Sequence, residues 1–363
     1  MKIVMILGTR PEIIKLSPII RECERKTLEY CILHTGQHYS YDLDTIFFQE
    51  LELPEPRYNL NVGSGSHAEE TGKMLIGVEE VLKTEKPAIV LVEGDTNTVL
   101  AGALAATKLD IKVGHVEAGL RSYDRTMPEE INRILTDHIS DCLFAPTERA
   151  RENLLKEGIS ENKIFVTGNT IVDAIFQNLE IAKREIGGLS KLNLEREKYL
   201  LVTLHRQENV VVEENLKGIL EGLKLVYEGL DLPIIFPIHP RTRKGITEFN
   251  LEIPKGIRLI EPVGFFDFLV LEANARLVLT DSGGVQEETC ILNVPCVTLR
   301  ENTERPETLE VGSNILAGVG PERILESANV MLNKKRRWRN PFGDGTAGKS
   351  IAEILLKEQT DKN

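Results

Sequence analysis

Cysteine is scarce in this chain, with only 5 among its 363 residues. The cysteines are odd in number, far apart and without a Cys-x-x-Cys pair: Cys23, Cys31, Cys142, Cys290 and Cys296. This pattern argues against a disulfide framework and a structural zinc site, since both need cysteines at close and regular spacing. A His-Glu-x-x-His motif is also missing. We therefore expect reduced thiols, no metal and a cytoplasmic location.

The chain also lacks an excess of basic residues and any long hydrophobic run. Acidic residues outnumber basic ones, 56 to 44, for a formal net charge of −12. Such a balance gives no electrostatic complement to nucleic acid or to an anionic membrane. No stretch approaches the roughly 20 apolar residues of a membrane span. We expect neither nucleic acid nor membrane as a partner, so local positive groups must bind any anionic ligand.

What the sequence does contain is an alternation of short β-rich apolar runs with helical patterns, which is typical of parallel sheets built from βαβ units. The alternation stops in a charged segment, 180–198, and then restarts. We predict an α/β protein with two Rossmann-like, doubly wound parallel-sheet domains that face a central cleft, over residues 1–175 and 190–345. The expected strands are Ile3–Leu7, Tyr30–His34, Ala88–Val92, Lys112–Val116, Cys142–Ala145, Ile164–Thr167, Tyr199–Leu204, Ile234–Ile238, Arg258–Pro262, Leu277–Thr280 and Cys296–Leu299.

Polar residues and glycines gather at the ends of these predicted strands. Ligands of such sheets bind outside the carboxyl ends of the strands, so we expect both halves to direct these residues toward one cleft. The strand-end residues are Gly8–Arg10, Glu93–Asp95, Glu117, His205, His239, Glu261 and Asp281–Ser282.

Two glycine-rich segments match nucleotide-binding patterns without the context that those patterns require. Gly343–Ser350 fits the P-loop pattern, but no predicted strand precedes it and too little chain follows it for an NTPase core. Gly63–Ala68 fits a loose dinucleotide fingerprint, but it follows a polar segment, 58–61, and not a buried strand. We interpret the first as a turn that opens a helix and the second as a loop. No cofactor is therefore predicted, and the chemistry must work without redox.

The junction between the first strand and the next helix is a candidate anion site. Pro11 is suited to open a helix, and Arg10, Lys15 and the helix amides could converge there on a phosphate. A capped surface helix in which Arg10 pairs with Glu12 explains the same residues.

A second junction, Thr280–Gly284, ends a strand of the second half. Gly283 and Gly284 permit close backbone approach, and the hydroxyl of Ser282 with the helix amides could receive a diphosphate. Glu288 follows one turn later, where it could take ribose hydroxyls. A serine N-cap with acidic first-turn residues is the alternative, although a pair of glycines exceeds what capping needs.

The carboxylate residues indicate a functional site more strongly than the two candidate anion sites do. Asp95 follows a predicted buried strand, and Glu117 lies within an apolar run, where a charge should be partnered or functional. Burial, or two acids sharing one site, raises a carboxyl pKa as general acid–base chemistry requires. Glu129 and Glu130 follow Pro128 at a helix start, where acidic residues equally well offset the helix dipole.

His205 ends the first predicted strand of the second half. A histidine at such a position could hydrogen-bond a diphosphate or protonate a leaving oxygen. A structural histidine is the alternative, and it is the stronger interpretation for His38, His115 and His239.

With these residues assembled, the chain resembles the non-hydrolysing UDP-N-acetylglucosamine 2-epimerase family over nearly its whole length. Ordered motifs in both halves carry the resemblance: Gly8–Lys15, Thr35–His38, Gly94–Thr98, Gly114–Ser122, Pro128–Arg133, Thr167–Ala174, His205–Asn209, Thr280–Glu288, Thr303–Glu307 and Asn340–Ala347. The resemblance implies a GT-B-like fold, a C-terminal helix over residues 346–360 that joins the first domain, a homodimer and no cofactor.

The resemblance also implies roles for matching positions. Asp95, Glu117, Glu129 and His205 would form the catalytic set. The UDP-sugar would contact two groups of residues. Arg10, Ser282, Gly283, Gly284 and His205 would hold the diphosphate, with Lys15 and Arg305 nearby, while Glu288 would hold the ribose and Val263 to Phe268 the uracil.

The implied reaction is reversible epimerisation at C2 of UDP-N-acetylglucosamine to UDP-N-acetylmannosamine, feeding surface polysaccharide or glycan synthesis. The C2 proton has no neighbouring ring carbonyl to acidify it, so UDP would be eliminated to give 2-acetamidoglucal and then added back. A hydrolysing 2-epimerase, a retaining UDP-sugar glycosyltransferase and a non-catalytic UDP-sugar sensor are the alternatives. Tyr39–Thr45 lacks the glutamines of bacterial members, and Gln207 replaces an arginine, so the resemblance does not extend to their activation by a second substrate molecule.

Overall fold

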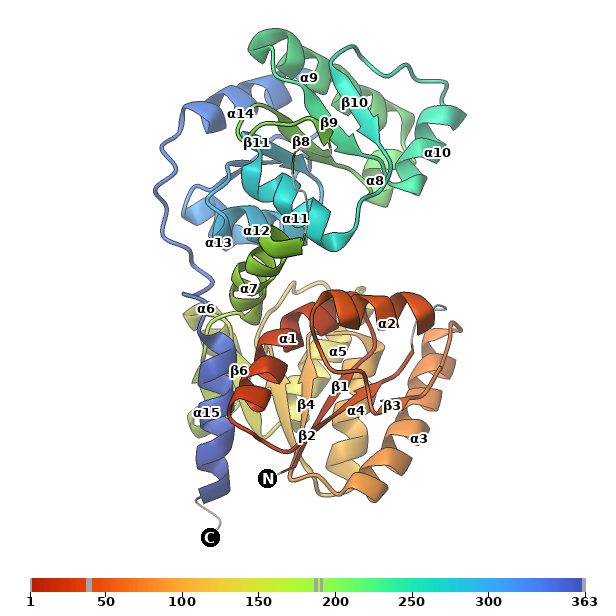
Figure 1. The fold of residues 1–363 in the computed structure, drawn as a ribbon, viewed down its shortest axis with the longest axis vertical. Coiled ribbons are helices and arrows are strands. Elements are labelled where there is room, and N and C mark those ends of the chain that lie inside the picture. Colours follow the sequence, from red (N-terminus) through yellow and green to blue (C-terminus); the bar gives the residue numbers. More distant parts are fainter. Residues whose placement is uncertain (1, 37–40, 186–188, 190–191, 361–363) are drawn as a thin grey trace. The chain divides into compact units, whose positions relative to one another are not determined.

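A computed structural model of the chain describes residues 2–36, 41–185, 189 and 192–360, with side chains described for these except 41–45, 183–185 and 358–360. The chain separates into two compact units (Figure 1). Unit 1 comprises Met1–Gln177 and Phe342–Asn363, and unit 2 comprises Asn178–Pro341. Gln37 and His38 of the motif Thr35–His38 lie outside the described residues, as do Tyr39 and Ser40.

Unit 1 contains a parallel sheet whose strand order is β3-β2-β1-β4-β5-β6-β7. Its central strands β1 and β4 are buried along their whole length, which explains why they read as continuous apolar runs. The strands are β1 (Ile3–Leu7), β2 (Tyr30–His34), β3 (Tyr58–Asn59), β4 (Ile89–Glu93), β5 (Lys112–Val116), β6 (Cys142–Ala145) and β7 (Ile164–Val166).

Helices connect these strands, and the C-terminal helix α15 packs beside α1 in the same unit (Figure 1). The helix α7 runs across the boundary between the units. The helices are α1 (Arg10–Arg25), α2 (Tyr41–Glu50), α3 (His67–Glu85), α4 (Asn97–Lys108), α5 (Pro128–Ile139), α6 (Glu148–Lys156), α7 (Thr170–Glu185) and α15 (Ala347–Thr360), with a short 3-10 turn at Glu161–Lys163.

The P-loop look-alike is the turn that opens α15. No strand lies between the preceding helix and α15, a stretch that the structure describes in full. The first amides of α15 are already occupied, because Ala347 N and Gly348 N donate to the carboxylate of Asp173 at 3.2 and 2.9 Å. The amides that a P-loop would offer to phosphate therefore hold a side chain of the protein itself.

Unit 2 repeats the plan with a parallel sheet of strand order β10-β9-β8-β11-β12-β13. Its strands are β8 (Leu200–Thr203), β9 (Ile234–Pro237), β10 (Ile257–Ile260), β11 (Leu277–Thr280), β12 (Cys296–Thr298) and β13 (Asn314–Leu316). Its helices are α8 (Gln207–Val210), α9 (Glu213–Leu230), α10 (Pro240–Glu248), α11 (Phe265–Asn274), α12 (Gly283–Ile291), α13 (Pro306–Glu310) and α14 (Pro321–Asn333). Together the two sheets confirm the predicted α/β class.

Two strands escaped the sequence analysis, β3 and β13. Both are short edge strands, and β3 consists of the polar pair Tyr58 and Asn59, so neither shows the apolar run that revealed the others. Gly63–Ala68 therefore follows a strand, β3, but not a buried one, as predicted, because both residues of β3 are only partly buried. Within the segment, Ser66 caps α3 by accepting a hydrogen bond from Glu69 N at 3.3 Å, and the last two residues, His67 and Ala68, belong to the helix and not to the predicted loop.

Each sheet has a point where the order of its strands reverses, between β1 and β4 in unit 1 and between β8 and β11 in unit 2. Ligands of doubly wound sheets bind outside the carboxyl ends of the strands at such switch points. Gly8–Arg10 and Glu93–Asp95 lie at the first switch point, and His205 and Asp281–Ser282 lie at the second. Among the described residues, no helix is both long and apolar enough to cross a membrane.

Candidate active site

A partly buried ammonium and two carboxyl groups meet where β4 and β5 end in unit 1. Lys15 Nζ lies 2.6 Å from Glu117 Oε2 and 3.2 Å from Glu93 Oε1. The side chains are 15%, 8% and 2% exposed, for Lys15, Glu117 and Glu93 respectively. Asn169, from the turn before α7, donates to the other oxygen of Glu117 at 3.0 Å. The carboxylate of Glu117 is therefore held from both sides, as its place in an apolar run predicted.

The backbone of Glu117 is strained. Its φ is +71°, a left-handed conformation that is uncommon for a residue with a side chain. Such strain persists only where the surrounding structure imposes it, and it clusters at functional sites. Here the Glu117 and Ala118 amides both donate to Phe144 O, at 3.1 and 3.2 Å, which turns the chain sharply after β5.

Asp95 lies beyond the end of β4 with its side chain 32% exposed. Its carboxylate pairs with Arg133 of α5, and its carbonyl accepts a hydrogen bond from Asn132 at 2.9 Å. Asp95 is thus fixed by α5 yet remains open to solvent, which suits a group that must reach a ligand.

Glu129 and Glu130, of which the resemblance placed only Glu129 in the catalytic set, occupy different environments. Glu130 is 1% exposed and accepts hydrogen bonds from Ser122 N and Tyr123 N, both at 3.0 Å, so it anchors the loop before α5. Burial opposes ionisation of Glu130, but these hydrogen bonds and Arg133 hold its pKa below the usual range. Glu129 is exposed on the first turn of α5.

At the junction of β1 and α1, the first candidate anion site, the structure matches neither the phosphate site nor the Arg10–Glu12 ion pair that the sequence offered. Glu12 does not pair with Arg10; its carboxylate accepts hydrogen bonds from Gly8 N, Thr9 N and Thr96 Oγ1. Burial raises the pKa of Glu12 to about 7. The amides before α1 therefore bind this side chain, and the ammonium of Lys15 is directed to carboxyl groups. Arg10 is exposed, with its guanidinium 5.5 Å from the centroid of the Phe47 ring.

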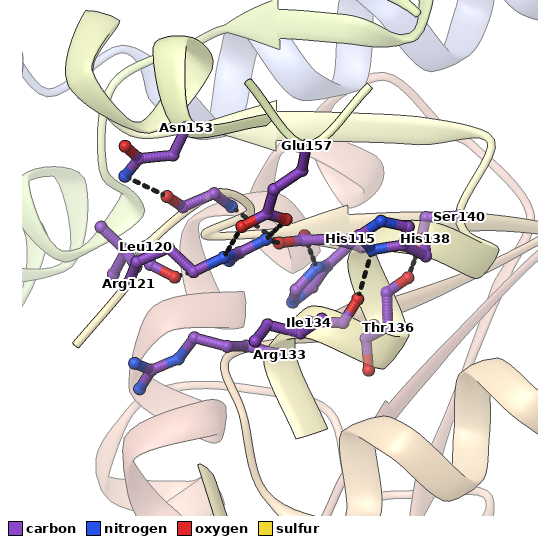
Figure 2. A network of polar contacts seen from close by, with 12 residues as sticks. His115, Leu120, Arg121, Arg133, Ile134, Thr136, His138, Ser140, Asn153 and Glu157 are labelled. Atoms are coloured by element: carbon purple, nitrogen blue, oxygen red, sulfur yellow. Dashed lines mark hydrogen bonds and ion pairs between the residues drawn. The ribbon is translucent and has the colours of Figure 1, made fainter. Parts of the chain in front are cut away.

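A buried network braces the same strand ends, and Figure 2 shows His115, Arg121 and Glu157 within it. His115 Nδ1 lies 2.6 Å from Asp137 Oδ1, and His115 Nε2 lies 2.8 Å from Gly94 O. Arg121 pairs with Asp137 at 2.7 Å and with Glu157 at 2.6 Å. Burial opposes ionisation of Asp137, but His115 and Arg121 hold its pKa below the usual range. His115 thus has the structural role that the sequence favoured, and it fixes the peptide next to Asp95.

His205 is the centre of the candidate site in unit 2. Its Nδ1 lies 2.8 Å from Asp281 Oδ1, which leaves Nε2 to face outward from a side chain that is 43% exposed. Asp281 is fully buried and also accepts hydrogen bonds from Arg206 N at 2.8 Å and Asn209 Nδ2 at 3.2 Å. Burial opposes ionisation, but these donors hold the pKa of Asp281 below its usual range.

The sequence analysis placed Asp281 at a strand end without giving it a role. Its position directly after β11, next to the predicted binding residue Ser282, was the available signal. Only the pairing of β8 with β11, which sets Thr203 beside Thr280, shows that Asp281 must meet His205.

The turn before α12 has the features of an anion site. Ser282 is the N-cap residue of α12, but its side chain makes no capping hydrogen bond. A Cβ atom added to Gly283 or Gly284 would meet no atom closer than 3.7 Å, so neither glycine is required by packing, and neither has a positive φ. This arrangement favours the ligand interpretation over simple capping, because the Ser282 hydroxyl does not cap the helix and Gly284 in its first turn is exposed.

The remaining predicted binding residues also lie in unit 2. Arg305 Nε lies 2.8 Å from Glu287 Oε1, and Glu288 contacts the buried Glu272 of α11. Val263 and Phe268 are partly buried and pack against one hydrophobic cluster of the unit. Unit 1 thus contains the predicted catalytic carboxylates together with Arg10 and Lys15, and unit 2 contains His205 and the other predicted UDP-binding residues.

Comparison with known proteins shows the family of the chain. Residues 21–356 match the model of the family described as UDP-N-acetylglucosamine 2-epimerase. The chain is 62% identical to the UDP-N-acetylglucosamine 2-epimerase of Methanocaldococcus jannaschii over 361 residues, covering 98% of this chain and 99% of that protein. It is 42% identical to the UDP-2,3-diacetamido-2,3-dideoxy-D-glucuronate 2-epimerase of Pseudomonas aeruginosa over 361 residues, covering 98% of this chain and all (100%) of that protein. The crystal structure of the M. jannaschii UDP-GlcNAc 2-epimerase with UDP-GlcNAc and UDP superposes with a TM-score of 0.87 at 62% identity, covering 98% and 100% of the two chains.

Proposed function

The chain belongs to the UDP-N-acetylglucosamine 2-epimerase family, and from that premise we propose that it interconverts UDP-N-acetylglucosamine and UDP-N-acetylmannosamine by inverting C2. One observation supports this most directly. Asp95 and Glu117 lie at the ends of neighbouring strands of one sheet, and each forms an ion pair with a basic side chain. Inversion needs a base on one face of C2 and an acid on the other, and a pair of such groups satisfies that need.

The proposed reaction is an elimination followed by an addition. A carboxylate takes the C2 proton, the electrons of the C–H bond form a C1–C2 double bond, and the C1–O bond breaks with its electron pair leaving on UDP. This gives 2-acetamidoglucal and UDP. UDP oxygen then adds back to C1 while a second group delivers a proton to the opposite face of C2. No oxidant is required, because each bond that breaks is formed again.

In this proposal the two units supply different groups to the reaction. Unit 1 supplies the proton-transfer groups, with Asp95 and Glu117 as the leading candidates and Glu129 as the third residue of the predicted set. Unit 2 holds the departing UDP: His205 Nε2, Ser282 and the first amides of α12 stabilise the charge on the diphosphate. Arg10 and Arg305 complete the charge balance. Glu288 binds the ribose and the segment from Val263 to Phe268 binds the uracil.

The test follows C2 by proton NMR while the protein is incubated with UDP-N-acetylglucosamine in deuterated water. We expect deuterium at C2 and accumulation of UDP-N-acetylmannosamine. Release of free N-acetylmannosamine and UDP would instead identify a hydrolysing enzyme. Absence of exchange at C2 would rule out both kinds of epimerase.

Matched variants test the roles of the carboxylates. Asp95→Asn and Glu117→Gln should each lose at least about a hundredfold in C2 exchange, the usual contribution of a general acid or base, while still binding UDP. Glu152→Gln is the control, since Glu152 is an exposed residue of α6 with its side chain 61% exposed. Exchange that survives in Asp95→Asn or Glu117→Gln at the level of the control removes that residue from the proposed set.

The P. aeruginosa relative favours a second candidate substrate, UDP-2,3-diacetamido-2,3-dideoxy-D-glucuronate, whose C2 chemistry is the same. The exchange assay therefore includes both sugars in parallel. The proposed substrate is supported if kcat/KM is higher for UDP-N-acetylglucosamine, and it is replaced if the order is reversed.

The proposal includes a homodimer in the cytoplasm that supplies UDP-N-acetylmannosamine for polysaccharide or glycan synthesis, as the family resemblance implies. Light scattering on the purified protein decides the assembly: the mass of one chain, 40.7 kDa, would exclude the dimer.

A further inference from the structure

Glu93 is a fully buried acid for which the proposed reaction has no use. It is the last residue of β4, is 1% exposed and pairs in register with Val116, next to Glu117. Lys15 Nζ lies 3.2 Å from Glu93 Oε1 and 2.6 Å from Glu117 Oε2, so a single ammonium contacts both carboxyl groups. Buried from solvent in this way, Glu93 can affect a bound substrate only through its neighbours.

The charges around Glu93 do not balance if every acid is ionised. The titratable groups that face it are Lys15 and Glu12 from α1 and Glu117 from the turn after β5. Three buried carboxylates beside a single ammonium would leave net negative charge without solvent, which costs several kcal/mol for each uncompensated ion. Protons must therefore remain in the cluster.

The geometry decides where a proton stays. Lys15 Nζ is 2.6 Å from Glu117 but 3.2 Å from Glu93, so the ammonium favours ionisation of Glu117 over that of Glu93. Two carboxyl groups can hydrogen-bond to one another only if one of them carries the proton, since carboxylates have no donor. Burial raises the pKa of Glu93 well above its usual range, and the negative charge of Glu117 raises it further against the opposing effect of Lys15.

We propose that Glu93 is a positioning residue that works as a neutral acid, donating a hydrogen bond to the Glu117 carboxylate while Lys15 neutralises Glu117. The inference deepens the proposed function, because it rests on Glu117 transferring a proton at C2. A neutral Glu93 orients the carboxylate without competing for the ammonium. Ionised Glu93 would place a second negative charge beside Glu117 and draw a proton onto it.

Two substitutions separate this role from a plain ion pair with Lys15. Glu93→Gln keeps a neutral side chain with a donor, so kcat should stay within about threefold of wild type, because the hydrogen bond to Glu117 is retained. Glu93→Leu removes the donor and should lower kcat about tenfold to a hundredfold with little change in KM, the range for loss of one hydrogen bond to a charged group. The alkaline limb of the pH profile of kcat should move to higher pH in Glu93→Gln, since glutamine cannot ionise.

Infrared difference spectroscopy reads the proton directly and needs no activity. We expect the carbonyl band of a protonated carboxylic acid in the wild type at neutral pH, with part of it lost in Glu93→Gln. Glu85→Gln is the control, because Glu85 is another buried glutamate but is paired with Lys2 and accepts a hydrogen bond from Tyr58. It should lose carboxylate intensity and leave the acid band unchanged.

The proposal is overturned if Glu93→Gln loses as much kcat as Glu93→Leu and also leaves the acid band intact, since Glu93 would then be an ionised partner of Lys15. If Glu93→Leu does not fold, Glu93→Gln alone decides through its pH profile and its infrared spectrum. If the wild type shows no C2 exchange, the proposed function fails, while the acid band still supports or overturns the protonation of Glu93.

Discussion

Replacing Asp281 by asparagine tests how unit 2 holds His205. The fully buried carboxylate of Asp281 accepts hydrogen bonds from His205 N and Nδ1, Arg206 N and Asn209 Nδ2, at 2.8 to 3.2 Å. Asparagine has nearly the same shape but no charge, and an NH2 group, which is a donor, replaces one of the two carboxylate oxygens. The substitution therefore changes the chemistry of the contacts without creating a cavity.

The magnitude follows from the orientation that the new amide must take. With its oxygen toward the backbone donors, it keeps the bonds from His205 N, Arg206 N and Asn209 Nδ2. Each of these weakens from a charge-assisted bond of roughly 1.5–3 kcal/mol to a neutral one of roughly 0.5–1.5 kcal/mol. The loss is about 1 kcal/mol for each bond and about 3 kcal/mol in total. For a folding unit of 150–250 residues this lowers the midpoint of unfolding by about 6–12 °C.

The same orientation points the amide N–H₂ at His205 Nδ1, where the wild type has an acceptor. In its neutral form His205 must then carry its proton on Nε2, the nitrogen that faces outward. Nitrogen-15 NMR of the histidines distinguishes the two tautomers. We therefore expect both a less stable unit 2 and an inverted His205 tautomer.

Thermal unfolding of the full chain measures the stability, with Asp231→Asn as the control. Asp231 is exposed and caps α9 at φ +51°, a position that asparagine tolerates equally well. Because the pKa of Asp281 is lowered on folding, its stabilisation is complete above about pH 5 and declines only in stronger acid. The reasoning is refuted if Asp281→Asn unfolds within about 1 kcal/mol of wild type at neutral pH and keeps the proton on Nδ1.

Further substitutions test unit 1. Asp137→Asn removes the charge that holds the buried Arg121 and His115, so the free energy of unfolding of unit 1 should fall by about 3–5 kcal/mol in denaturant titrations; a loss below about 1 kcal/mol would contradict the network. Gly119→Ala should cost about 2–4 kcal/mol, because φ is +83° and the new Cβ would lie 2.3 Å from a backbone oxygen, whereas Gly63→Ala, at φ +70° in open space, should cost only about 1 kcal/mol. Equal losses would show that backbone strain alone, without the clash, sets the cost.

Residue patterns predicted most of the fold because its strands are buried on both faces. A central strand of a parallel sheet must be apolar throughout, so β1, β4, β8 and β11 show in the sequence as short runs of branched residues. The edge strands β3 and β13 need no such run, and they were missed. No apolar run of this kind precedes Gly343–Ser350, so the sequence argued against a P-loop there. In the structure the helix amides of this segment bind Asp173.

Partners of the site residues were harder to predict, because they come from distant parts of the chain. The sequence placed Lys15 near a phosphate on the basis of its charge, but the ammonium lies between Glu93 and Glu117. The residue pattern alone did not distinguish Glu130 from Glu129, which the resemblance placed in the catalytic set, and only the loop of Ser122 and Tyr123 shows that Glu130 is an anchor.

The sequence by itself determined the class of fold, the strand ends at which chemistry gathers and the family resemblance, because these depend on residue type and order along the chain. Tertiary structure alone decided which groups carry protons. That property depends on burial and on charges that the fold brings within 4 Å from distant parts of the chain, as for His205 with Asp281 and for Lys15 with Glu117.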